Sequence, residues 1–149
     1  MSPRRGGGFR TILNLVRRGL GGKQGDGRQY VSWIHEHDFV RAVRFLIERE
    51  IEGPVVVSAP DAVPNEEFMR TLREAWGKRI AVDAPRWLLE IGAFLLRIET
   101  ELVLKSRRVA PSRLLDAGFT FRYPTWSEAA RDLVGRVKNK GVTPLLAIW

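Results

Sequence analysis

The spacing of apolar residues along the chain predicts several amphipathic helices. Between residues 9 and 20, apolar side chains recur every three or four positions, and a run of glycines ends this segment. Similar stripes predict a second helix at Asp38, a third at Asn65 and a last one after Thr125. Asp38 and Asn65 would cap their helices, and Thr125 with Glu128 forms a capping box. The inward face of the second helix is expected to consist of Phe39, Val43, Leu46 and Ile47.

Short strands are expected between these helices. Tyr30–His35 is rich in β-branched and aromatic residues, which is typical of a strand. Val55–Val57 is an apolar run of the kind found in strands that are covered on both faces, and residues 80–82 suggest another short strand. From residue 119 to 123, aromatic and polar residues alternate, which would place three aromatic rings on one face of a strand. The pattern therefore predicts an α/β fold that is mostly helical, with three to four short strands.

Three further segments complete the pattern. Residues 85–104 suit a long helix, but charges such as Arg97 keep it short of the ~18 uninterrupted apolar residues that a membrane span needs. We expect this helix to be buried or to face a partner. Residues 112–117 suit a short helix that ends at Gly118. Residues 139–149 have no clear period, so this tail either packs back on the body or marks a disturbed terminus.

The charge of the chain is concentrated at its start. The whole chain carries a formal net charge of +8, yet residues 1–30 hold seven basic residues against Asp26 alone, and residues 31–149 are nearly balanced. A basic arm of this kind can contact phosphate. The more ordinary interpretation is a solvated chain end, and we do not expect nucleic-acid binding.

The composition also limits the possible metal and redox chemistry. The chain has no cysteine, which excludes disulfides and thiolate ligands and suits a reducing cytoplasm. No apolar stretch of the secretory type follows Arg4 and Arg5. His35 and His37 would share one face of a strand, but a metal site needs at least a third ligand, and no distant cluster supplies it visibly. We therefore expect polar or structural contacts for both histidines and no bound metal.

The glycines between residues 19 and 27 raise the possibility of a phosphate-binding loop. Backbone N–H groups of such a loop can cradle a phosphate. A dinucleotide-binding loop, however, follows a strand and opens a helix, and here the predicted order is helix, loop, strand. A plain flexible connection fits better, and a loop that lines a substrate remains an alternative.

Three segments resemble, in order, the carboxyl-terminal half of one family. These are GDGRQYVSWIHEHDFVRAVRFL, SAPDAVPNEEFMRTLREA and RRVAPSRLLDAGFTFRYPTWSEA. They are similar to the NAD-dependent epimerase family of atypical extended short-chain dehydrogenase/reductases, described as predicted nucleoside-diphosphate-sugar epimerases. The similarity runs from about Gly8 to Val134, and the chain departs from the family pattern at Val56 and Arg107. A typical member is about twice as long, because a Rossmann half with an NAD(P) fingerprint comes first.

The resemblance implies an organisation and a set of candidate residues. Residues 1–28 would be a basic arm, helix and glycine-rich loop, residues 29–138 the epimerase-family carboxyl-terminal domain, and residues 139–149 an irregular tail. It implies that four residues border a substrate cleft, without giving any of them a catalytic role: Gln29, Ser32, Trp33 and His35.

Two functional hypotheses follow from the resemblance. The first is the substrate-side portion of an NAD(P)-dependent nucleotide-sugar epimerase or oxidoreductase, which binds no cofactor alone and is therefore inactive alone. The second is a non-catalytic interaction module that pairs with a Rossmann-containing chain or with itself. In that case the apolar stripes at residues 9–20 and 87–104 would form the exposed binding surface.

Overall fold

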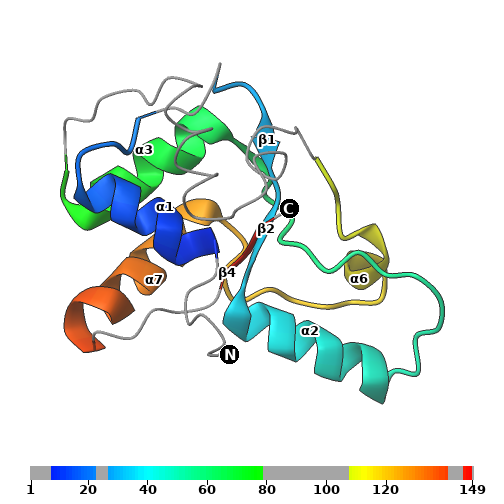
Figure 1. Cartoon of the computed structure of the whole chain (residues 1–149). Helices are drawn as coiled ribbons and strands as arrows, with labels where there is room; N and C mark the ends of the chain where they lie inside the picture. The colour runs from blue at the N-terminus through cyan, green and yellow to red at the C-terminus, as the bar shows by residue number, and fades with distance from the viewer. Residues whose placement is uncertain (1–7, 23–26, 79–107, 141–145, 149) are drawn as a thin grey trace, which may run out of the picture.

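The computed structural model describes residues 8–22, 27–78, 108–140 and 146–148. Among the described elements, helices α1 (Gly8–Arg17), α3 (Asn65–Trp76) and α7 (Trp126–Lys140) gather on one side of the short strands, and α2 (Glu36–Glu48) and α6 (Ser112–Asp116) lie on the other side (Figure 1). The predicted α/β class, mostly helical with a few short strands, is confirmed. In chain order the described elements are α1 (Gly8–Arg17), β1 (Tyr30–Val31), β2 (Trp33–His35), α2 (Glu36–Glu48), β3 (Val63–Pro64), α3 (Asn65–Trp76), α6 (Ser112–Asp116), α7 (Trp126–Lys140) and β4 (Leu146–Ile148).

The described strands form two antiparallel pairs. β1 pairs with β3, so that Val31 lies opposite Val63, and β2 pairs with β4, so that Ile34 lies opposite Ala147. The run predicted as one strand over Tyr30–His35 is thus divided at Ser32, because its two halves find different partners. Residues 146–148 of the tail pack back on the body as β4, one of the two outcomes left open by the sequence.

The main core lies between α1, α3 and α7. Trp126, at the start of α7, occupies its centre: the ring stacks on Phe68 with 4.0 Å between centroids and meets Trp33 edge-on at 5.1 Å. The indole N–H of Trp126 donates to the carbonyl oxygen of Phe68 at 2.9 Å, so this buried polar atom has a partner. On α1 the buried side chains are Phe9, Leu13 and Val16, so the stripe predicted at residues 9–20 is core and not an exposed docking surface.

A second, smaller cluster lies on the other side of the strands. It is built around Ala42 of α2, Leu114 of α6 and Phe119, with Val55 and Val57 packed against it. The structure has no strand at residues 119–123 or at Val55–Val57. The predicted alternation nevertheless holds at 119–121, since Phe119 is buried and Thr120 is exposed.

Helix α2 turns inward a face that agrees with the expected one only at Leu46. Leu46 packs on the second cluster as predicted, together with Ala42 and Phe45, whereas Phe39, Val43 and Ile47 are exposed. The apolar stripe on this helix is wide enough for two faces, so spacing alone did not decide which of them is buried.

The helix ends agree with the sequence only in part. Gly77 closes α3 with a left-handed φ of 86°, as expected, and Thr125 lies 2.8 Å from the Glu128 carboxylate at the start of α7. The two predicted asparagine and aspartate caps are wrong. Asn65 is the first residue of α3 without a side-chain cap, and α2 begins at Glu36, before Asp38. The strand predicted at 80–82, the helix at 85–104 and the first residues of the basic arm lie outside the described residues.

Candidate functional site

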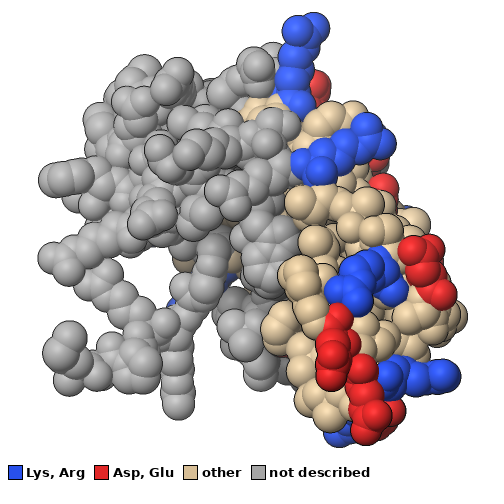
Figure 2. Space-filling view, turned by 90° about the vertical axis from the view of Figure 1, so that its right-hand side faces the viewer, with Lys and Arg blue, Asp and Glu red and all other residues tan. Residues whose placement is uncertain are grey.

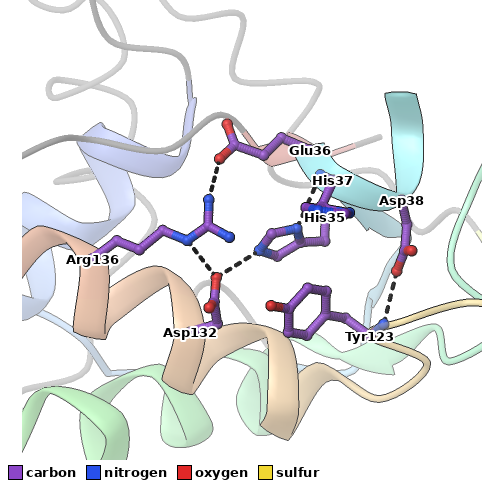
Figure 3. Close-up of polar contacts among 7 residues, drawn as sticks. All are labelled: His35, Glu36, His37, Asp38, Tyr123, Asp132 and Arg136. Carbon is purple, nitrogen blue, oxygen red and sulfur yellow. Dashed lines mark hydrogen bonds and ion pairs between the residues drawn. The ribbon is translucent and has the colours of Figure 1, made fainter. Parts of the chain in front are cut away.

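The candidate site is a polar network where β2, α2 and α7 meet (Figure 3). His35 ends β2, and its Nε2 lies 3.0 Å from Oδ2 of Asp132 on α7. The same carboxylate oxygen accepts from Nε of Arg136 at 2.7 Å, and Arg136 reaches Glu36 at 2.7 Å. His35 is fully buried, whereas the side chains of Asp132, Arg136 and Glu36 are 27–31% exposed.

The hydrogen bonds of His35 assign its tautomer. Its Nδ1 accepts a hydrogen bond from the backbone N–H of His37 at 3.1 Å, which makes His35 the N-cap of α2. Nδ1 therefore carries no proton, and Nε2 carries the proton that points at Asp132. Both ring nitrogens are thus engaged, and neither offers a lone pair to a substrate. In this arrangement His35 is a positioning residue that joins β2, α2 and α7.

Burial keeps His35 neutral. It lowers the pKa of the imidazole below the ordinary value of 6.5, and the hydrogen bond and negative charge of Asp132, which raise the pKa, offset only part of this effect. The ring also stacks on Tyr123 with 4.1 Å between centroids. A proton on Nδ1 would face the His37 N–H, so the geometry and the electrostatics both favour the neutral ring.

Asp38 ties α2 to the segment before α7. Its fully buried carboxylate accepts the backbone N–H groups of Arg122 at 2.9 Å and Tyr123 at 2.8 Å, and it also meets Arg41 at 2.8 Å. Three donors compensate the cost of burying this charge. Asp38, which was expected to cap a helix, therefore fixes the loop that carries Tyr123, and Tyr123 stacks on His35.

The four residues expected to border a cleft are all buried. The Ser32 hydroxyl accepts from the Val109 N–H at 3.2 Å, and the Trp33 indole donates to the Asp61 carbonyl at 2.6 Å. Gln29 is 8% exposed, and His35 is held as described above. The structure thus buries all four side chains, while their role beside a substrate stays a prediction.

The sequence pointed to His35 but missed its partners. Asp132 and Arg136 stand four residues apart on α7, a spacing that allows an ion pair, and this was the available signal. The pairing with His35 spans 97 residues and could not be read from spacing. The two histidines were predicted to share one face of a strand. This prediction is wrong, because His37 belongs to α2.

Two glycines at the start of the glycine-rich connection have structural explanations. Gly21 is buried, and a Cβ there would lie 2.8 Å from Cγ2 of Val16, so the backbone approaches α1 too closely for a side chain. Arg73 binds the Gly21 carbonyl at 2.6 Å, and Gly19 has a left-handed φ of 80°. The connection follows helix α1 and precedes β1, which is the reverse of a dinucleotide-binding loop.

The described residues also bear on three other features: metal-binding clusters, membrane-spanning helices and charged patches. Within residues 8–22, 27–78, 108–140 and 146–148, no group of three or more metal-binding side chains occurs. No helix in the described ranges has the length and apolar character needed to cross a membrane. Where the described residues form the face on the α6 side of Figure 1, basic and acidic side chains are intermingled (Figure 2).

Comparison with known proteins gives one consistent result. Residues 84–133 match the family model "Domain of unknown function (DUF1731)". The epimerase family protein SA0724 of Staphylococcus aureus is 32% identical over 130 residues, which cover 87% of this chain and 42% of that protein. The epimerase family protein MT2273 of Mycobacterium tuberculosis is 37% identical over 127 residues, which cover 83% of this chain and 41% of that protein.

A solved structure agrees with these relatives. The human epimerase family protein SDR39U1 (isoform 2), determined with NADPH, superposes with a TM-score of 0.77 at 28% identity, over 90% of this chain and 45% of that one. This chain corresponds to the carboxyl-terminal half of epimerase family proteins. It spans less than half the length of the curated relatives that it matches. The family expected from the sequence is therefore confirmed.

Proposed function

We propose that this chain is the substrate-side portion of an NAD(P)-dependent epimerase or oxidoreductase that acts on nucleotide sugars, and that it is inactive alone. Hydride transfer needs a nicotinamide held beside the substrate, and the protein supplies the placement. The observation that carries the proposal is coverage: the chain matches only 45% of a relative that was determined with NADPH. The remaining part of such a protein would hold the cofactor.

Features of the described residues support the proposal that this chain forms the substrate side and does not hold the cofactor. The glycine-rich connection runs from a helix to a strand, and Gly21 is required by its contact with Val16. Both nitrogens of the His35 ring are engaged inside the protein, so this residue would position β2 and not transfer a proton. We assign Gln29, Ser32, Trp33 and His35 to the wall behind the substrate cleft, as residues that shape it from within.

Fluorescence titration with NADPH tests the proposal. The isolated 149-residue chain should show no saturable binding below ~0.1 mM, which lies within the usual range of substrate affinities. The Mycobacterium tuberculosis relative, titrated in parallel, serves as the full-length control. Saturable binding of NADPH to the isolated chain in that range would refute the proposal.

An interaction module is the second candidate, and the exposed apolar residues of α2 favour it. Val40 and Ile47 are 59% and 71% exposed, which is unusual for apolar side chains that lie close together on one helix. Size-exclusion chromatography with light scattering at several concentrations, combined with a dye that reports exposed apolar surface, tests this candidate. A monomer at all concentrations that leaves the dye dark would contradict it.

A further inference from the structure

Helix α2 is apolar on two sides, and the described structure covers only one of them. Ala42, Phe45 and Leu46 face the second cluster. The outward stripe has the helical spacing of a second buried face, with exposures of 40% for Phe39, 59% for Val40, 37% for Val43 and 71% for Ile47. A helix that is apolar on most of its circumference is normally buried on both sides. The outward stripe of α2 therefore has the character of an interface.

The apolar segment Val55–Val57 lies beside the same cluster. Val55 and Val57 pack on it, whereas Val56 points away and is 45% exposed, which is the alternation of a strand. Among the residues that the structure describes, none forms a backbone hydrogen bond with these three valines. An apolar run whose backbone groups bond to none of the described residues can act as a template for pairing with a further strand.

We propose that the outward stripe of α2 and the Val55–Val57 segment together form the docking surface for the amino-terminal half of an epimerase-family protein. This inference rests on the proposed function. The occupant follows from length: relatives extend to more than twice the matched segment, and one of them was determined with NADPH. The partner would present an apolar face to α2 and a strand edge to the valines.

A cleavable fusion tests the docking surface. The part of the Mycobacterium tuberculosis relative that this chain does not cover is placed before the chain, with a protease site in the linker. After cleavage, size-exclusion chromatography reports whether the halves stay together. The test variant is Val43→Glu combined with Ile47→Glu, and the matched control is Arg44→Glu, which places a carboxylate on the same helix beside the stripe. All three positions are exposed, so the fold should tolerate them.

The expected result is that the unmodified halves and the Arg44→Glu control co-elute, and that the double variant separates with at least about tenfold weaker affinity, equivalent to ~1.4 kcal/mol. Co-elution of the double variant would overturn the docking surface and leave the proposed function standing. Separation of the unmodified halves would overturn the proposed function itself. A twofold mass of the isolated chain that the double variant abolishes would instead assign the stripe to a second copy.

A second measurement does not depend on the charged variants. Because the chain has no cysteine, Ile47→Cys provides a single labelling position on the stripe. An environment-sensitive dye attached there should shift its emission to the blue in the uncleaved fusion, relative to the isolated chain. The same dye at Arg44→Cys should shift much less. Equal spectra for the fusion and the isolated chain at position 47 would contradict the assignment.

Discussion

His35 and Asp132 are 97 positions apart, yet Nε2 of the one lies 3.0 Å from Oδ2 of the other. This contact joins the end of β2 to the middle of α7, and Arg136 and Glu36 extend it to the first turn of α2. The network thus holds α7 against β2 and α2, which follow each other directly along the chain.

The first prediction concerns pH. Burial lowers the pKa of His35, so below about 6.5 the unfolded chain takes up a proton that the folded protein excludes. The free energy of unfolding should therefore fall as the pH decreases through this region, by at most about 1.4 kcal/mol per pH unit from this residue. Urea unfolding followed by circular dichroism over a pH series measures the slope.

The matched variant for this prediction is His35→Asn. Asparagine retains a side-chain acceptor for the N-cap of α2 but does not titrate. The variant should be less stable than the original protein at neutral pH, because the ring packs on Tyr123, and its stability should depend less on pH. An unchanged pH slope in the variant would show that other groups cause the dependence.

The second prediction concerns Asp38. Asp38→Ala removes the acceptor of the Arg122 and Tyr123 N–H groups, so it should lower the free energy of unfolding by about 2–4 kcal/mol. Asp116→Asn, at an exposed position at the end of α6, is the control and should change stability by less than about 0.5 kcal/mol. Equal stabilities of the two variants would contradict the role of the Asp38 carboxylate.

The third prediction compares two glycines. A Cβ at Gly21 would meet Cγ2 of Val16 at 2.8 Å and its Cα at 3.0 Å, so Gly21→Ala should destabilise the protein by about 1–3 kcal/mol. Gly135 lies in α7, and a Cβ there would meet no atom within 4 Å apart from its chain neighbours and the nearby backbone of its own helix, so Gly135→Ala should stabilise by up to about 1 kcal/mol. Thermal unfolding measures both. A neutral Gly21→Ala would contradict the packing explanation of Gly21.

Local patterns succeeded where neighbouring residues determine the structure. The helix at residues 112–117, the turn at Gly77 and the Thr125–Glu128 pair were all recovered, because each depends on contacts within one turn of helix. The alternation of buried and exposed residues at 119–121 was also recovered, although no strand forms there. Consecutive side chains of an unpaired segment can alternate between buried and exposed when the segment runs along a small hydrophobic cluster.

Patterns failed where a choice between faces or partners was needed. Two sides of α2 are apolar. The side with Phe45 and Leu46 packs on the second cluster, and this choice depends on residues distant in sequence. Asp38 was predicted as a helix cap because it precedes an apolar stripe. In the structure His35 caps α2, and the Asp38 carboxylate accepts the backbone N–H groups of residues 122 and 123. The histidine pair at 35 and 37 was separated because the helix begins between them.

By itself the sequence determined the family, the helical character and the order of the helix, glycine-rich connection and strand, since these depend on residue types and short spacings. Only the tertiary structure decided that His35 meets Asp132, that the stripe at residues 9–20 is core, and that the outward side of α2 stays apolar and exposed. Such pairings depend on which surfaces are buried together, and burial is a property of the packed chain as a whole.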